Sequence, residues 1–316
     1  MRCGACFLVS AVGIRLLGSF RVVPADGPAP CNLSPRAQAC LAFLVLHPSR
    51  QFRRDVLAGL FWGESPEDKA RASLRSTLWR LRRVLEPDGV RKGTYLPATG
   101  TGEVSFNGES AHDLDVTAFE RGIAAAIERA DQVLSDALLA HVQAGLDRYD
   151  GDLLEGMDDD WILPERERLR CAYINALACQ MHNLRLRGRY EAALTCGRRI
   201  LACEPLRESI HREMMRLYVQ NGERAEALRH YSRCADVLQR ELSIAPMPET
   251  RALYDEMRTQ QSPASATKSA IGTVADPQAC LDLAIDDLMR AMREVRAAAA
   301  RVAQSTPPDS AKPAGR

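Results

Sequence analysis

Aromatic side chains are scarce in this sequence, and its charges nearly cancel. Phe, Trp and Tyr make up 5% of the 316 residues, and 42 basic residues stand against 41 acidic ones. So few aromatics, beside stretches rich in Ala, Leu, Arg and Glu, argue against a β-sandwich and favour helices packed on helices. Apolar residues make up 46% of the chain, close to the globular average, which excludes a disordered protein. The length suits about two domains.

A long hydrophobic run is also missing. The apolar stretch 5–17 is interrupted by Arg15, is followed by no small-residue cleavage pattern, and is far too short to span a bilayer. We therefore expect no signal peptide and no membrane association, and we place the protein in the cytoplasm.

The sequence contains no familiar motif of catalysis or cofactor binding. There is no G-x-S-x-G, H-E-x-x-H or G-x-x-x-x-G-K-[ST] string. The ten cysteines share no repeated spacing, and the lone pair Cys3 and Cys6 has no second pair at zinc-finger distance, so we expect reduced core cysteines. Asp158 to Asp160 lack EF-hand spacing and fit a solvated turn. We expect no enzyme, no cofactor and no metal site.

The small net charge hides an uneven distribution. Residues 1–110 carry 15 Lys and Arg against 9 Asp and Glu, which leaves 27 against 32 for the remainder. A basic first third and an acidic rest are typical of a nucleic-acid-binding domain joined to an interaction domain.

Local signals divide the first sixty residues into a strand and two helices. Residues 14–23 are apolar and β-branched and precede a Pro-Asp-Gly-rich turn, which predicts one strand. Ser34 and Pro35 suit a helix start, and helical spacing predicts a helix over 35–47. A second helix is expected over 54–62, with Val56, Leu57, Leu60 and Phe61 facing inward.

The next segment, 66–85, predicts a third helix with a divided surface. Leu74, Leu78, Leu81 and Leu85 recur at helical spacing and form a core-facing stripe. Six cations and no acid occupy positions 69–85, and an arc beside and opposite the leucines holds Arg71, Arg75, Ser76, Trp79, Arg82 and Arg83. Such a helix can enter a major groove, where Arg binds phosphates or guanine. The alternative is an ordinary solvated basic face.

A hairpin is expected directly behind this helix. Residues 95–97 and 104–108 read as short strands around the Gly-rich tip 99–102. A basic third helix followed by a hairpin is the layout of a winged helix-turn-helix, with Arg91 and Lys92 near the base of the wing.

The rest of the chain reads as paired helices. Two helices are expected between 115 and 149, and from 166 the pattern is helical for almost a hundred residues. The strings that begin at Gly188 and Gly222 align at an offset of 34 residues, the period of tetratricopeptide repeats, whose small residues let helices approach closely. Such helices suit the binding of a protein segment; alternatively, they only stack on the first domain.

Together these segments resemble the transcriptional activators of the SARP type, in which an OmpR-like winged helix precedes a bacterial transcriptional activation domain. The resemblance covers about residues 12–258 and is carried by residues 41–47, 54–63, 72–85, 149–154 and the two Gly-led repeats. It implies a mainly α protein: an N-terminal winged helix-turn-helix with small β elements, then a tetratricopeptide-like helical domain. The expected segments are an N-terminal extension (1–11), the DNA-binding domain (12–110), the activation domain (113–258), a flexible linker (259–277), an amphipathic helix (278–303) and a disordered tail (304–316).

The resemblance also implies partners and site residues. The partners are double-stranded promoter DNA, bound at direct repeats by a tandem pair of subunits, and RNA polymerase. Groove-facing residues would be Arg71, Arg75, Ser76, Trp79, Arg82 and Arg83, and phosphate-binding residues would be Arg53, Arg54 and Lys92. Larger members add an ATPase, for which no phosphate-binding loop is present here, and the early first strand leads us to expect no receiver domain. The alternative function is a protein–protein adaptor whose winged helix does not bind DNA.

Overall fold

A computed structural model describes residues 12–23, 33–48, 50–87, 89–97, 102–129 and 132–259. The described residues fall into two compact units, the first ending at Cys203 and the second beginning at Glu204. The expected N-terminal extension, C-terminal helix and tail, and the linker beyond residue 259, lie outside the described residues. Among the helices described, none is both long and apolar enough to pass through a bilayer.

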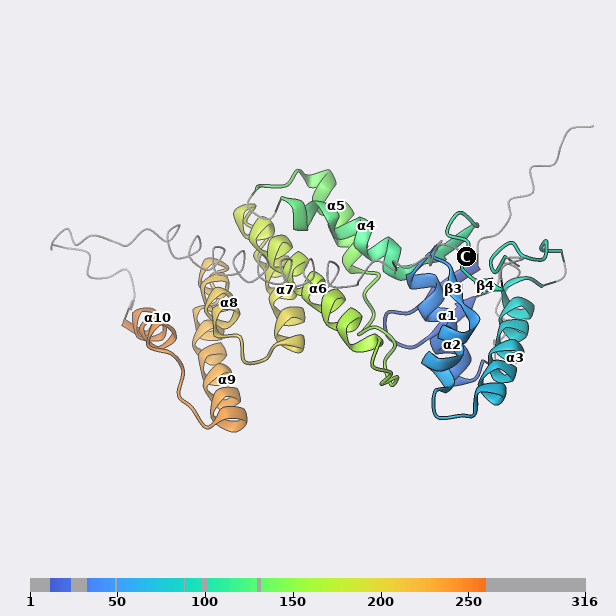
Figure 1. Cartoon of the computed structure of the whole chain (residues 1–316). Coiled ribbons are helices and arrows are strands. Elements are labelled where there is room, and N and C mark those ends of the chain that lie inside the picture. Colours follow the sequence, from blue (N-terminus) through green and yellow to red (C-terminus); the bar gives the residue numbers. More distant parts are fainter. Residues whose placement is uncertain are drawn as a thin grey trace, which may run out of the picture. The chain divides into compact units, whose positions relative to one another are not determined.

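The protein is mainly helical, as the sequence predicts (Figure 1). The elements of the first unit are β1 (Val12–Arg15), β2 (Arg21–Val23), α1 (Pro35–Leu46), β3 (Phe52–Arg53), α2 (Arg54–Trp62), α3 (Glu67–Leu85), β4 (Glu103–Val104), β5 (His112–Leu114), α4 (Asp115–Glu128), α5 (Asp136–Leu146), α6 (Ile162–Leu186) and α7 (Tyr190–Cys203). The elements of the second are α8 (Glu208–Gln220), α9 (Arg224–Leu242) and α10 (Pro248–Thr259).

The leucine stripe of α3 forms the core of the winged helix. Leu74, Leu78, Leu81 and Leu85 are each at most 1% exposed, and α3 packs against α1 and α2. Their spacing keeps them on one side of the helix, so one surface is buried and the other is left to solvent. The prediction of a core-facing stripe is confirmed.

The single strand predicted over 14–23 is wrong, because the chain reverses within it. β1 and β2 are the two arms of an antiparallel hairpin, in which Ile14 lies opposite Val22. The reversal includes Gly18, whose φ of 85° is one that residues with a Cβ rarely adopt. β1 also pairs in parallel with β5, giving a three-stranded sheet in the order β2-β1-β5.

Helix α2 also buries fewer side chains than predicted. Leu57, Ala58 and Phe61 are buried, but Val56 is 57% exposed and Leu60 is 41% exposed. At about 100° per residue, Val56 and Leu60 lie together on the side of this short helix that faces away from the buried residues. The prediction that both face inward is therefore wrong.

The segment after α3 has a strand partner outside the expected hairpin. β4 pairs antiparallel with β3, which precedes α2. The two arms of the hairpin also touch, since the backbone N–H of Asn107 donates to the carbonyl of Tyr95 at 2.9 Å. Residues 98–101, most of the expected tip, lie outside the described residues.

The helical half confirms the predicted helices and corrects the role of its glycines. Gly188 and Gly222 have φ values of 68° and 81°, and a Cβ added at either would meet nothing within 4 Å. They therefore serve as left-handed turns after α6 and α8, not as points of close helix contact. The close approach lies elsewhere: a Cβ on Gly122 of α4 would come 2.4 Å from the Cα of Gly145 in α5.

A loop with the sequence Tyr-Asp-Gly-Asp-Leu-Leu-Glu-Gly, residues 149–156, holds the N-terminal hairpin. Gly18 donates its N–H to the carbonyl of Asp152 at 2.8 Å, and Leu154 donates to the carbonyl of Leu16 at 2.8 Å. The Arg166 guanidinium in turn donates to three carbonyls of this region, those of Leu153, Leu154 and Met157. The loop thus fixes the winged helix against the first helices of the helical half.

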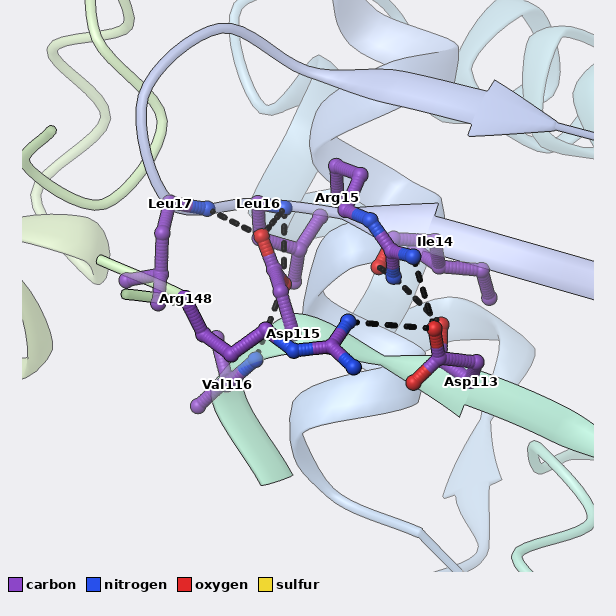
Figure 2. A network of polar contacts seen from close by, with 8 residues as sticks. All are labelled: Ile14, Arg15, Leu16, Leu17, Asp113, Asp115, Val116 and Arg148. Atoms are coloured by element: carbon purple, nitrogen blue, oxygen red, sulfur yellow. Dashed lines mark hydrogen bonds and ion pairs between the residues drawn. The ribbon is translucent and has the colours of Figure 1, made fainter. Parts of the chain in front are cut away.

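A buried carboxylate completes this junction (Figure 2). Asp115, which is 2% exposed, accepts hydrogen bonds from the backbone N–H groups of Leu16, Leu17 and Val116 at 2.8–3.0 Å. Burial raises the pKa of this carboxyl, and the three N–H donors oppose that rise. Nearby, Asp113 forms a more exposed ion pair with Arg15 at 2.6 Å.

Candidate nucleic-acid interface

Helix α3 presents a basic surface on the side opposite its leucines. At about 100° per residue, Ser76, Trp79 and Arg83 lie roughly 130–170° from the centre of the leucine stripe, and Arg75 lies roughly 90° from it. All four side chains are exposed. Lys69 and Arg80 extend the same exposed surface, so α3 places a continuous group of cations in solvent. We call this surface the basic face of α3: Lys69, Arg75, Ser76, Trp79, Arg80 and Arg83.

A large aromatic ring lies in the middle of the basic face. Trp79 is 56% exposed, and the Arg83 guanidinium lies 5.0 Å from the centre of its ring. This cation–π contact lies on the solvent side of the helix. An exposed indole beside a cation offers an apolar surface for a base or a thymine methyl group as well as a positive charge.

Arg71 and Arg82 lie nearer the leucine stripe and contact the rest of the winged helix. They lie roughly 50° and 70° from the centre of the stripe. The Arg71 Nε–H donates to Asp55 Oδ1 of α2 at 3.0 Å, and its Nη2 donates to Glu67 Oε1 at 2.5 Å. Arg82 is half-buried, and its Nε–H donates to the carbonyl of Leu96 at 3.3 Å.

The three predicted phosphate-binding residues are exposed on neighbouring segments. Arg53 precedes the first residue of α2, Arg54 is that first residue, and Lys92 lies in the turn after α3. Arg53 Nη2 is 3.8 Å from Asp55 Oδ2. Cations at the start of α2 and at the base of the wing flank the helix that would enter a groove, which is the arrangement expected for backbone contacts.

Two acidic residues, neither of them predicted from the sequence, shape this surface. Glu86, just after α3, accepts hydrogen bonds from the backbone N–H groups of Gly93, Tyr95 and Leu96, and so folds the segment behind the helix. Asp55 is 16 residues from Arg71, so only the packing of α2 on α3 reveals their contact. The Glu67–Arg71 pair, by contrast, has the i,i+4 spacing that a sequence can show.

The described residues offer no cluster of three or more His, Cys, Asp or Glu side chains able to hold a metal ion. Of the six cysteines in that part of the chain, Cys40, Cys179, Cys196 and Cys234 are buried. Burial raises the pKa of the Cys40 thiol to about 12, so this thiol stays protonated and unreactive at neutral pH. Cys3 and Cys6 lie outside the described residues.

Both halves of the chain match known domain families. Residues 29–96 match the family described as "Transcriptional regulatory protein, C terminal", and residues 114–258 match "Bacterial transcriptional activator domain". The chain is 30% identical over 249 residues to the regulatory protein AfsR of Streptomyces coelicolor, and 28% identical over 292 residues to the transcriptional regulatory protein EmbR of Mycobacterium tuberculosis. These alignments cover 78% and 88% of this chain.

The relatives differ in length from this chain. It spans 24% of AfsR and 71% of EmbR. A solved structure of M. tuberculosis EmbR in complex with a low affinity phosphopeptide superposes with a TM-score of 0.58 at 26% identity, covering 80% of this chain and 65% of that one.

A winged helix followed by this helical domain defines a class of bacterial transcriptional regulators. Both domain families occur here in that order, and the two relatives named above are regulators aligned across both. In both domains and in their order, the chain resembles the SARP-type regulators of that class.

Proposed function

We propose that this protein is a sequence-specific DNA-binding regulator of transcription that inserts α3 into the major groove. The observation that carries the proposal is the basic face of α3, exposed along its length and supported from behind by four buried leucines. Arg75, Arg80 and Arg83 would contact phosphates or guanine edges, and Trp79 would contact a base. Arg53, Arg54 and Lys92 would bind backbone phosphates on either side.

The further steps of the proposed function follow from the family. A regulator of this type would bind promoter DNA in the cytoplasm, with two subunits in tandem on direct repeats, and would activate transcription through RNA polymerase. A duplex enriched from a random-sequence pool by the purified protein would supply both the operator and the spacing of any repeats. Transcription from a promoter carrying that duplex, with purified polymerase, then tests activation.

Salt dependence tests the DNA-binding step. If about five to seven cations contact phosphates, affinity for duplex DNA should fall by several decades between about 50 and 200 mM salt, because each contact releases condensed counterions. Fluorescence anisotropy of the enriched duplex over this range measures the slope. Weak binding at every salt concentration would favour the adaptor function instead.

Arg75 is the sharpest residue for a test, because it is exposed and the structure gives it no side-chain bond to another described residue. Arg75→Ala should lower affinity for the enriched duplex by about 1–3 kcal/mol and leave the Tm unchanged. Arg251→Ala, an exposed arginine of α10, removes the same charge far along the chain and should leave affinity unchanged. Equal losses in the two variants would contradict the proposed interface.

A further inference from the structure

Arg71 is held in place before any ligand arrives. Its Nε–H is bound by Asp55 of α2 and its Nη2 by Glu67, one turn earlier on α3, at 3.0 and 2.5 Å. Two carboxylates from two helices therefore grip one planar guanidinium. A guanidinium fixed at two of its nitrogen atoms cannot rotate freely, so it meets a partner at a smaller cost in conformational entropy.

The two acids leave one part of the guanidinium for another acceptor. Among the described residues, the side-chain contacts of Arg71 use Nε and Nη2, and neither of them uses Nη1. Arg71 also lies near the start of α3, and residues at the start of a recognition helix are the ones that meet base edges. Its side chain remains 46% exposed, so the N–H groups of Nη1 can reach an acceptor in a groove.

Asp55 also approaches a second cation of the proposed interface. Its Oδ2 atom lies 3.8 Å from Arg53, which is exposed at the start of α2. One carboxylate thus offsets charge on Arg53 and Arg71, both of which would otherwise attract any phosphate. The negative charge of Asp55 lowers the affinity for every duplex. Only a duplex with a base that accepts a hydrogen bond from the oriented Arg71 regains that affinity.

We propose that Asp55 is a specificity-determining residue of the DNA interface, which orients Arg71 toward one base pair and withholds charge from the phosphate backbone. The inference rests on the proposed function and assigns to an acid of α2 a role in sequence discrimination. If Asp55 instead forms only a surface ion pair, its removal leaves both the Tm and the discrimination between duplexes unchanged.

The test compares affinities for two duplexes in the full-length protein. One is the duplex enriched by the wild-type protein from a random pool, and the other is the same composition in scrambled order. Asp55→Asn should raise affinity for the scrambled duplex and lower the ratio of specific to scrambled affinity by about tenfold, the low end of the range for one base contact. Asp55 is 51% exposed, so the variant should fold with an unchanged Tm.

Glu64→Gln is the matched control. Glu64 is an exposed acid of the turn between α2 and α3, and it is not one of the two acids that bind Arg71. The substitution therefore removes the same charge as Asp55→Asn but leaves the contacts of Arg71 in place. It should raise affinity for both duplexes alike and leave their ratio unchanged. In an Arg71→Ala background, Asp55→Asn should produce no further fall in the ratio, because the side chain that it orients is gone.

Each outcome bears on a different step. A wild-type protein that binds duplex without enriching any sequence, or that ignores duplex altogether, contradicts the proposed function itself. A wild-type protein that discriminates, beside an Asp55→Asn variant whose ratio matches that of Glu64→Gln, overturns the role of Asp55. A fall in the ratio that persists in the Arg71→Ala background shows that Asp55 acts through another residue, and it also overturns the proposal.

Discussion

Replacing Asp115 by alanine tests how the two halves of the first unit are joined. The carboxylate is buried and receives the N–H groups of Leu16, Leu17 and Val116 (Figure 2). Asp115→Ala leaves three buried donors without their acceptor, each at a cost of about 1–3 kcal/mol. Water can enter the space left by the carboxyl group and bind some of these donors, so we expect a loss of about 3–5 kcal/mol in the free energy of unfolding.

Urea denaturation followed by far-UV circular dichroism measures this loss. Asp113→Ala is the matched control, two residues earlier in the chain, because Asp113 pairs with Arg15 and Arg148 on a partly exposed surface. Exposed ion pairs contribute at most about 1 kcal/mol, so the control should lose little stability. Equal losses in the two variants would refute the idea that the Asp115 hydrogen bonds hold the junction together.

Three further changes probe the packing of the helices and a buried histidine pair. Leu78→Ala should cost about 2–5 kcal/mol of stability by opening a cavity behind the basic face of α3, measured by urea denaturation. Gly122→Ala should destabilise the protein by about 1–3 kcal/mol because its Cβ would meet the backbone of α5. A Cβ at Gly59 would meet nothing within 4 Å, so Gly59→Ala should stabilise the protein by about 0.5–1 kcal/mol. A destabilised Gly59→Ala would contradict this contrast. Burial lowers the pKa of His230 to about 3, and so does His211, whose Nδ1 lies 3.0 Å from Nε2 of His230. As the pH falls, His230 therefore becomes protonated in the unfolded chain before it does so in the folded protein. The contribution of His230 to the free energy of unfolding should therefore be complete above about pH 6.5. It should fall toward about pH 3 by up to about 1.4 kcal/mol per pH unit. His230→Gln should reduce this slope, as measured by acid denaturation.

Where structure depends on neighbours along the chain, the sequence was a sufficient guide. The helix predicted over 35–47 is found as α1, that over 54–62 as α2, and that over 66–85 as α3 with the same buried leucines. A helix is held by contacts three and four residues apart, so apolar spacing and nearby Pro and Gly reveal it. The same signals did not predict the hairpin of β1 and β2, because both arms share one apolar pattern and only Gly18 marks the reversal.

Part of the candidate site also follows from the sequence, and part of it depends on tertiary packing. Spacing alone places Ser76, Trp79 and Arg83 on the solvent side of α3, and all three are exposed there. The contacts of Arg71 with Asp55 and of Arg82 with Leu96 join different elements of the winged helix. No sequence pattern indicates them, because they arise only when α2 and the segment after α3 pack against α3.

By itself, the sequence determined which residues form helices, which side of α3 is buried, and which side carries its cations, because these properties follow from the helical repeat. Only the tertiary structure decided which of those cations also bind groups of other elements, as Arg71 does with Asp55 and Arg82 with the carbonyl of Leu96. It also decided that the loop 149–156 receives the N-terminal hairpin. Such pairings join residues from 14 to more than a hundred positions apart, and their geometry exists only after the helices have packed.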